Sequence, residues 1–496
     1  KMNIKSVVPR MLKVNVPEVA TKVLKARRAN DKRIFTVSSN WLPLFGFHGD
    51  AQVVEEVIAP GKGFRVRLAN DSDTKTKKVY MREYKSRSAN PLKPDAKRVE
   101  QLIETASQRL IEEAMGDAEH AHITFREGEI TFVPITNAER KLLQDLSQDD
   151  MINTLVAMTG GVDCSVLEQG GFRVDTVVEY RPQEKRDKTD YTEMTAMSAL
   201  ANCAPRVLCN EDIYRLDMNK LTQLIGDTPI TVLHASIQCD EFSLSKGSKA
   251  VRKSLEDMSS TMDMFIPTLN MINAIKPPIV VVENVPGFMG TEANPSAIYD
   301  VFKLQLRRQG YNVHDGIFDA RDYGGYTSRR RMYMVATSLD APFDMPKPLT
   351  EQERAGLHVW NDIILPNWDE IAGANKADIT DLKVTKDALA TGWARIISEN
   401  KPYAPTLMKA QGQDTKDAVM IERDGRYYRV PVSVQAKLNA LPESFNTNWM
   451  PKDKAAQIIG QSICCKLHHA IMNSVKQHLE HFKTSYSPGT QMALSL

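Results

Sequence analysis

Five short apolar runs, separated by longer and more polar stretches, constrain the fold of this chain more than any other feature. The runs cover residues 154–158, 174–179, 230–235, 279–283 and 331–336. The intervening stretches have helical character, so the pattern predicts repeated strand–helix–strand units and an open, doubly wound α/β sheet. Ligands bind such sheets at the carboxyl ends of the strands, and chemically active side chains are expected there.

Charge divides the chain unevenly. Residues 1–100 contain 22 Lys and Arg against 10 Asp and Glu, whereas the remaining 396 residues contain 42 against 52. A basic module joined to a mildly acidic body suggests an anionic partner for the module, such as nucleic acid. A solvated basic surface would explain the same counts.

The basic region reads as strands. Alternating apolar and polar residues over 33–68 and 77–87, with turns at Gly49-Asp50 and Gly61–Gly63, predict a mostly-β module. Through Trp41-Leu42 and Gly46-Phe47 it resembles the AbrB/SymE-type swapped-hairpin DNA-binding module, which would imply a dimer. A plain small β-barrel is the alternative. Helical periodicity over 95–116 predicts that a helical linker follows.

These patterns predict six segments and a cytoplasmic protein. No apolar window is long enough to span a bilayer, no secretory signal core is present, and the six cysteines lack framework spacing. The predicted segments are a β module (1–88), a helical linker (89–148), the α/β domain (149–340), an irregular region (341–425), a helical return to the domain (426–482) and a tail (483–496).

The first strand ends carry residues suited to a nucleotide-like ligand. Gly160-Gly161 follows the first run and precedes a helix, which lets a ligand approach the backbone, although such a pair is often only a tight turn. Glu179 ends the second run, where an acid can hold ribose hydroxyls. Asp212 stands at the third strand position, and a helix N-cap is its alternative role.

The later strand ends carry a thiol, an acid and two arginines. Cys239 directly follows an apolar run and precedes a basic loop, which favours a nucleophilic thiolate, although a lone cysteine is more often structural. Glu283 interrupts a strand that should stay apolar, so it is either paired or catalytic. Arg329 and Arg331 alternate into a strand and can share one face, where they could bind a phosphate or a base carbonyl.

Together these segments resemble the cytosine C5-methyltransferases. Cys239-x-x-Phe242-Ser243 resembles the family's nucleophile motif, and Glu283-Asn284-Val285 matches its Glu-Asn-Val motif. Further resemblances, in the family's order, are Tyr323-Gly324 through Arg329-x-Arg331, Ala404-Pro405-Thr406, Leu441–Phe445 and Gly460-Gln461-Ser462. The resemblance implies a Rossmann-like domain dependent on S-adenosylmethionine, with a small target-recognition region.

The resemblance also assigns roles in catalysis and in cofactor binding. Cys239 would add to cytosine C6, Glu283 would hydrogen-bond N3 and the exocyclic amine, and Arg331, supported by Arg329, would bind the O2 side. The base would have to leave the duplex to reach these groups. The cofactor would be held by Gly160, Gly161, Glu179, Asp212, Gly460, Gln461 and Ser462.

A mobile loop over 244–254 would close on double-stranded DNA. Its basic side chains could meet phosphates, together with the preceding serine of the nucleophile motif. The DNA-contacting set is Ser243, Lys246, Lys249, Arg252 and Lys253. No cysteine or histidine spacing indicates a metal site, so no metal is expected.

Several positions depart from the family's pattern, mainly where the cofactor should lie. They are Val156, Met158, Gln238, Asp240, Thr327, Asn439, Ala440 and Gln461. The enzyme could use S-adenosylmethionine in a reshaped pocket, need a partner, or accept a modified sulfonium donor. About 65 residues separate the arginine motif from Pro405-Thr406, so few side chains can read base edges and a short or relaxed target is expected.

The resemblance leaves three functions open. The first is DNA cytosine C5-methylation, in restriction protection, phage anti-restriction or regulation. The second is methylation of RNA, because one branch of the family acts on tRNA, although the Cys-Phe-Thr signature of that branch is absent here. The third is a non-catalytic nucleic-acid-binding protein, against which the intact Cys239, Glu283 and Arg331 argue.

Overall fold

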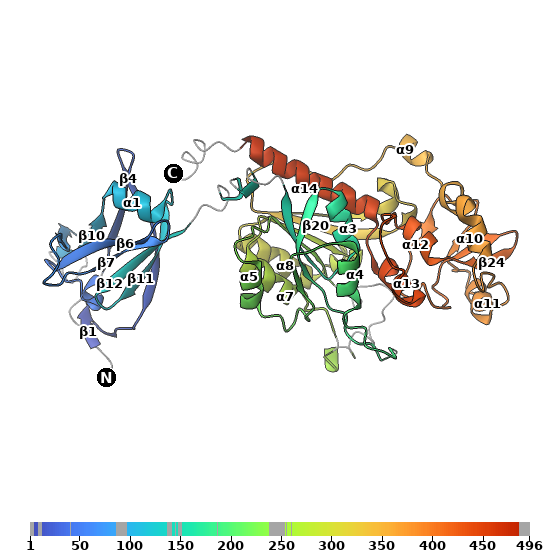
Figure 1. Cartoon of the computed structure of the whole chain (residues 1–496), viewed down its shortest axis with the longest axis horizontal. Helices are drawn as coiled ribbons and strands as arrows, with labels where there is room; N and C mark the ends of the chain where they lie inside the picture. Colours follow the sequence, from blue (N-terminus) through green and yellow to red (C-terminus); the bar gives the residue numbers. More distant parts are fainter. Residues whose placement is uncertain are drawn as a thin grey trace. The chain divides into compact units, whose positions relative to one another are not determined.

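The chain divides into two units, Lys1–Lys141 and Leu142–Leu496, whose buried hydrophobic residues form separate clusters (Figure 1). The computed structural model describes residues 4–7, 12–39, 41–85, 97–135, 141–143, 145–146, 151–185, 187–237, 253, 255–258 and 260–485. In this part of the chain, no helix is long and apolar enough to cross a bilayer.

The described residues of the first unit form antiparallel sheets and the helix α1 (Gln108–Met115). A six-stranded sheet runs in the order β3 (Ala20–Lys25), β11 (His120–Arg126), β12 (Glu129–Ile135), β7 (Gly63–Leu68), β6 (Gln52–Ala59) and β8 (Lys77–Lys78). A four-stranded sheet runs in the order β4 (Arg27–Ala29), β5 (Lys32–Ser38), β10 (Lys97–Thr105) and β9 (Tyr80–Lys85). A separate hairpin pairs β1 (Ile4–Val7) with β2 (Leu12–Asn15).

Aromatic side chains fill the core of this unit. Phe64 and Phe132, on neighbouring strands, stack with ring centroids 4.3 Å apart, and Phe35 meets both rings edge-on. All three are fully buried. Pairs of this geometry stabilise a core beyond the apolar area that they bury, so residues from both sheets form one hydrophobic core.

The expected helix over 95–116 and the helical linker over 89–148 are wrong. Residues 97–105 form the strand β10, which pairs with β5 and β9, and only the later part of the segment is helical. β11 and β12 also belong to this unit and pair with β3 and β7. Ile103 and Thr105 are two positions apart, so they lie on one face of the strand, and both are fully buried. Strand pairing and this burial outweigh the helical pattern of the sequence.

The resemblance to a swapped-hairpin module, with the dimer that it would imply, stays a prediction. Trp41 begins a short 3-10 turn over Leu42–Phe45, and the hairpin of β6 and β7 is completed by β12 of the same chain. The strands that close the sheet therefore lie within one chain, as in the alternative small β-barrel.

The second unit is built on a seven-stranded sheet. Its order is β15 (Val207–Cys209), β14 (Phe172–Val178), β13 (Ile152–Ala157), β16 (Val232–Ser236), β17 (Ile279–Asn284), β20 (Arg330–Thr337) and β18 (Asn312–Asp319). The first five strands are parallel, and β20 is antiparallel to both of its neighbours. The predicted doubly wound α/β fold is confirmed, and each of the five predicted runs is a strand. β15 and β18 were not among those runs.

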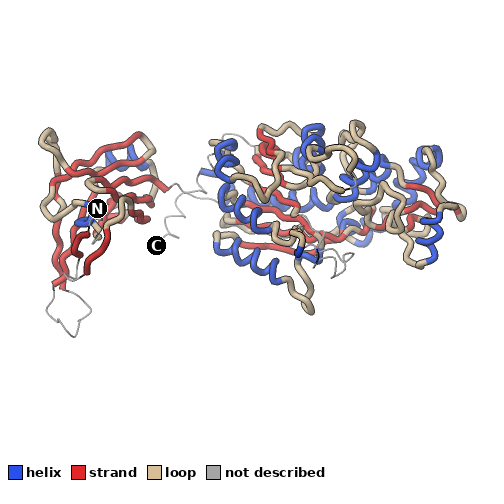
Figure 2. Tube along the Cα trace, turned by 90° about the horizontal axis from the view of Figure 1, so that it is seen from below, coloured by secondary structure: helices blue, strands red, loops and turns tan. Residues whose placement is uncertain are grey.

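Helices cover both faces of this sheet (Figure 2). One face packs on α5 (Met218–Ile225), α7 (Phe265–Ile275) and α8 (Ala297–Arg308), and the other on α3 (Val162–Gln169) and α14 (Cys465–Ser485). In β17, Val280 and Val282 enter the first layer while Val281 enters the second. Burial on both faces explains why the sequence shows continuous apolar runs rather than alternation.

Residues 341–429 carry short helices and a small sheet. The helices are α9 (Glu351–Ala355), α10 (Trp368–Gly373) and α11 (Lys383–Ala390), and β21 (Ile396–Ile397), β23 (Met420–Arg423) and β24 (Arg426–Arg429) form the sheet. A third core joins this region to α12 (Val432–Leu438) and α13 (Lys452–Gln461). The region therefore packs on the elements that bring the chain back to the sheet.

Candidate active site

The sheet changes winding direction between β13 and β16. The chain leaves β13 through α3 toward β14, whereas β16, on the other side of β13, leads to β17. A crevice forms where the connections diverge, outside the carboxyl ends of the strands. The structure describes some of the site residues that the sequence predicts at strand ends. Each of these lies at an end of one of these strands or of a neighbouring strand.

A strained loop follows β13. Met158, Gly160 and Gly161 all have positive φ, at 64°, 68° and 87°. A Cβ on Gly161 would lie 2.8 Å from the backbone nitrogen of Ala199 in α4 (Met194–Asn202), so only glycine fits there. Met158 holds a conformation that costs a non-glycine residue about 1–2 kcal/mol. Met158 is also one of the positions at which the sequence departs from the family's pattern.

Glu179 fastens this loop to the end of β14. Its Oε1 accepts hydrogen bonds from the backbone nitrogens of Thr159 at 2.6 Å and Gly160 at 2.7 Å. The side chain is buried, and burial raises the pKa of its carboxyl to about 7, against the lowering effect of these hydrogen bonds. In this structure Glu179 therefore holds the glycine loop in place, whereas the sequence predicts that it binds ribose hydroxyls.

A pocket opens beside Glu179. It has a volume of about 410 Å³ and is lined by Tyr180, Pro182, Gln183, Glu211, Asp212 and Arg215. Asp212 accepts a hydrogen bond from the backbone nitrogen of Tyr214, so it also stabilises its own turn. An aromatic ring and acidic side chains next to a glycine turn fit the adenosyl and sulfonium parts of S-adenosylmethionine, because the first stacks and the second is cationic.

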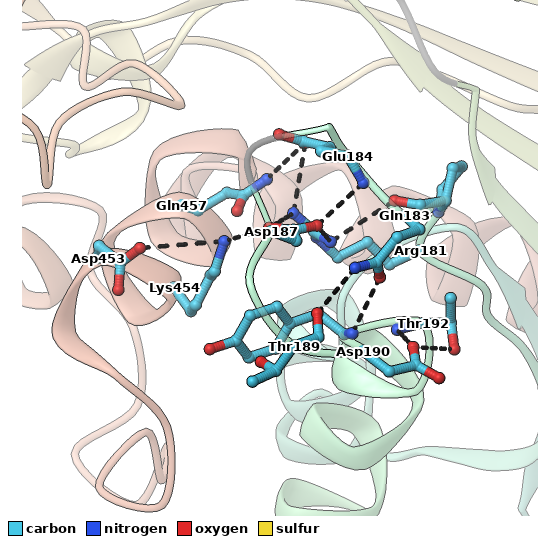
Figure 3. A network of polar contacts seen from close by, with 12 residues as sticks. Arg181, Gln183, Glu184, Asp187, Thr189, Asp190, Thr192, Asp453, Lys454 and Gln457 are labelled. Carbon is cyan, nitrogen blue, oxygen red and sulfur yellow. Dashed lines mark hydrogen bonds and ion pairs between the residues drawn. The ribbon is translucent and has the colours of Figure 1, made fainter.

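A buried ion network joins the loop after β14 to α13 and was not predicted from the sequence (Figure 3). Asp187 receives a hydrogen bond from Arg181 at 2.5 Å and one from Lys454 at 2.7 Å. Hydrogen bonding to Arg181 is the main cause that holds the pKa of Asp187 well below its usual range. Tyr191 lies under both cations. The network ties the loop after β14 to α13.

The last family-like motif, Gly460-Gln461-Ser462, follows Lys454 at the end of α13. Gly460 ends the buried part of α13, where a Cβ would lie 2.1 Å from the backbone oxygen of Met408. Ser462 is buried and receives a hydrogen bond from Asn439, whereas Gln461 is exposed. Asn439, one of the departures, thus supports this turn through its side-chain amide.

Glu283 and Arg331 form an ion pair. Arg331 Nε lies 3.1 Å from Glu283 Oε1, and the Glu283 carboxyl is nearly buried at the end of β17. Burial raises the pKa of Glu283 despite the opposing charges of Arg331 and Arg329. Because its pKa is raised, this carboxyl can hydrogen-bond a base either as an acceptor or, when protonated, as a donor.

Arg329 has a different role. It is fully buried and donates to the backbone oxygens of Leu407 at 2.9 Å and Gly460 at 3.0 Å. It therefore joins the strand region to the segment after the target-recognition region and to the last motif. The structure places Arg331 beside Glu283 and Arg329 in the scaffold behind them.

A polar cluster missed by the sequence analysis lies next to Glu283. Asp163 in α3, His234 in β16 and His468 in α14 are all buried, and their ligand-type atoms lie within 4.8 Å of one another. The two imidazole rings meet edge to face, and His468 Nδ1 contacts the hydroxyl of Tyr333 at 3.2 Å. Burial lowers the pKa of His234 to about 3, so the rings are neutral. The three residues pack together in the core, where His468 is hydrogen-bonded to Tyr333 and Asp163 to Ser236, whereas neither ring nitrogen of His234 has a hydrogen-bond partner among the described residues. Sequence spacing could not reveal the cluster because three distant segments contribute.

The predicted nucleophile and most of the predicted DNA contacts lie outside the described residues. These are Cys239, Ser243, Lys246, Lys249 and Arg252. Lys253 is described and exposed. β16 ends at Ser236, three positions before Cys239, and Ser236 lies in register with Glu283.

Comparison with known proteins identifies a family. The family of C-5 cytosine-specific DNA methylases matches residues 201–477. The type II methyltransferase M.FnuDI of Fusobacterium nucleatum is 24% identical over 246 residues, covering 44% of this chain and 69% of that protein. M.NlaX of Neisseria lactamica is 25% identical over 259 residues, covering 50% and 76%.

Solved structures share the fold. The Entamoeba histolytica methyltransferase EhMeth and the S. pombe Dnmt2 methyltransferase each align with a TM-score of 0.50 at 15% identity, covering 66% of this chain and 99% of theirs. The family match covers more than half of the chain and includes the Glu-Asn-Val and arginine motifs. The chain therefore belongs to the C-5 cytosine-specific DNA methylases and is an S-adenosylmethionine-dependent DNA (cytosine-5)-methyltransferase.

Proposed function

We propose that this chain methylates C5 of cytosine in double-stranded DNA through a covalent adduct between Cys239 and C6 of a flipped base. The observation that carries the proposal is the Glu283–Arg331 pair, at 3.1 Å. Glu283 lies on β17, next to the strand β16 that precedes Cys239, and Arg331 lies on β20, on the other side of β17. Cytosine presents N3, an exocyclic amine and O2 along one edge. A carboxyl and a guanidinium side by side match that edge.

The chain's own residues would divide the chemistry. The Cys239 thiolate adds to C6, which turns C5 into an enamine-like carbon that can accept a methyl group. Glu283 hydrogen-bonds N3 and the amine, and Arg331 holds O2, so charge that develops in the ring is stabilised. The glycine loop and the pocket beside Glu179 would hold S-adenosylmethionine, whose sulfonium would supply the methyl group. Loss of the C5 proton then releases the thiolate.

DNA binding would use two further parts of the chain. The loop over 244–254 and its lysines would meet phosphates around the flipped nucleotide, together with Ser243. The basic first unit would add sequence-independent affinity. The recognition region is small, so direct reading of bases would be limited and the target short or relaxed.

Trapping on a mechanism-based substrate tests the proposal. A duplex oligonucleotide with 5-fluorocytosine cannot lose a C5 proton, so a methylated adduct should persist and migrate as a protein–DNA complex under denaturing conditions. The expected result is a complex with the full chain and none with Cys239→Ser. A full chain that binds DNA but forms no complex would contradict the covalent mechanism.

The same assay can be repeated with RNA. Competition between unmethylated duplex DNA and tRNA, followed by identification of the labelled nucleoside, should give 5-methyldeoxycytidine. Preferential labelling of RNA would overturn the DNA assignment. Supply of unmodified S-adenosylmethionine as sole donor also tests the expectation that it suffices.

A further inference from the structure

A carboxylate and two imidazole rings converge in the core of the second unit. They belong to Asp163 in the first turn of α3, His234 in β16 and His468 near the start of α14. One ligand-type atom of each residue lies within 4.8 Å of those of the other two, and no member is more than 1% exposed. Nitrogen and oxygen donors from three elements therefore surround one buried position.

The ring nitrogens of this group lack the partners that buried polar atoms normally have. Among the described residues, neither nitrogen of His234 and no group at His468 Nε2 completes a hydrogen bond. His234 Nδ1 lies 3.5 Å from Asp163 Oδ2, which is longer than a good N–H···O bond of about 2.9 Å. Because unpaired polar atoms are costly in a core, the arrangement calls for a further group that the three residues share.

The charge around this position favours a cation. Asp163 accepts a hydrogen bond from the hydroxyl of Ser236 at 3.1 Å, but no lysine or arginine in the described part of the chain lies within ion-pair distance of its carboxylate. Glu283 and Glu179 interact electrostatically with Asp163 and add negative charge, and Arg331 is engaged by Glu283. A bound cation would offset the cost of burying this carboxylate.

The donor set suits a transition metal such as zinc. Zn²⁺ binds imidazole nitrogens and carboxylate oxygens at about 2.0–2.2 Å, so tetrahedral ligands lie about 3.3–3.6 Å apart. The 3.5 Å between Asp163 and His234 already fits this spacing. Mg²⁺ and Ca²⁺ prefer oxygen ligands, so two imidazoles argue against them.

Tyr333 holds the third donor in place. Its hydroxyl lies 3.2 Å from Nδ1 of His468, and both residues are fully buried. When Nδ1 carries the ring proton and donates it to the tyrosine oxygen, the lone pair stands on Nε2, the nitrogen without a partner. Metal-bound histidines are commonly oriented by such a hydrogen bond from their other nitrogen.

We propose that Asp163, His234 and His468 bind one divalent transition-metal ion, with zinc as the expected metal. The ion joins α3, which follows the glycine loop, to β16 and to α14, so it fastens elements on which the candidate active site is built. None of the three ligands lines the pocket beside Glu179, so the role is structural. Sequence spacing predicts no metal because the ligands lie in distant segments. The inference does not rest on the proposed function.

Elemental analysis of the full chain tests the site directly. The protein is produced in zinc-supplemented medium, purified without metal-affinity chromatography and dialysed against metal-free buffer. About one zinc ion per chain is expected, and X-ray absorption at the zinc edge should show nitrogen and oxygen ligands only. A wild type without a stoichiometric transition metal would overturn the proposal. Sulfur in the coordination shell would also overturn it, because the ion would then belong to cysteines.

Matched variants locate the ion. His234→Gln and His468→Gln remove one imidazole each and should lose the zinc. His469→Ala should keep it, because His469 follows His468 on α14 but is exposed. Zinc retained at the wild-type level in both glutamine variants would place the ion elsewhere and refute the assignment.

Thermal stability provides a readout that is independent of methyl transfer. Binding of a buried structural ion contributes to the free energy of folding, so wild type refolded with zinc should unfold at a higher temperature than wild type refolded with a chelator. His234→Leu should unfold at the same temperature in both conditions, since it lacks a ligand. If the wild type also shows no difference, the three residues form a metal-free core cluster and the proposal is wrong. Activity on DNA enters neither test, so failure of the proposed function would leave this result unaffected.

Discussion

Lys454 and Asp187, 267 positions apart in the chain, form an ion pair at 2.7 Å that is almost closed to solvent. Arg181 approaches the same carboxylate from the other side. The pair joins α13, which precedes the last family-like motif, to the loop after β14, which borders the candidate cofactor pocket.

Asp187→Ala should destabilise the second unit by about 3 kcal/mol, because it removes the buried carboxylate that two buried cations share. Asp453→Ala, which removes a contact of Lys454 at 3.9 Å from an exposed carboxylate, should change stability by less than about 0.5 kcal/mol. Urea unfolding measures both. The pKa of Asp187 is lowered by folding, so its contribution is present at neutral pH and is lost as pH falls below the unfolded value.

Glu179→Gln should stabilise the protein above pH 7. Folding raises the pKa of this carboxyl from 4.5 to about 7, so its ionisation opposes folding. The wild type loses stability as pH rises from 4.5 to 7, up to about 3 kcal/mol, whereas glutamine keeps the hydrogen bonds and never ionises. Thermal unfolding measured at pH 5 and pH 8 should give the variant a higher unfolding temperature than the wild type only at pH 8. An equal difference at both values would contradict this assignment.

Arg329→Met should mainly lower stability, whereas Arg331→Met should mainly lower activity. Arg329 satisfies two buried carbonyls, so its loss should lower the free energy of unfolding by more than about 2 kcal/mol. Arg331→Met leaves the nearly buried Glu283 carboxyl without its cation, and that carboxyl can protonate, so this variant should lose less stability than Arg329→Met. It should lose methyl transfer by about 100-fold or more. Calorimetry together with methyl incorporation into DNA separates the two roles.

Met158 offers a test of backbone strain. With φ at 64°, Met158→Gly should change the free energy of unfolding by less than about 1 kcal/mol, because relief of strain offsets lost contacts. Met158→Val should cost more, about 2 kcal/mol, because β-branched residues resist this conformation. A larger loss with glycine than with valine in urea unfolding would show that the methionine side chain, not the backbone, determines stability here.

Removal of residues 1–141 should weaken DNA binding and flatten its dependence on salt, because the first hundred residues carry the excess of basic side chains. The cut must spare Leu142 and Leu146, which are buried in the core of the second unit. Binding measured over a series of salt concentrations gives the slope. An unchanged slope would assign the basic unit another role.

The sequence by itself determined the fold class and the family. Continuous apolar runs are read reliably because a strand buried on both faces leaves no alternative, and Glu283 stood out as an acid in such a run. The sequence could not determine β10, because an amphipathic helix and a paired strand both fit residues 95–116, and only pairing with β5 and β9 decides between them.

Tertiary structure alone decided which polar groups meet. Asp163, Ser236 and Glu283 come from α3, β16 and β17, and Asp187 and Lys454 from segments far apart in the chain. Their ionisation depends on burial and on the nearest charge, which chain spacing does not encode. Arg329 and Arg331, two positions apart, differ for the same reason: one is enclosed by backbone carbonyls and the other faces Glu283.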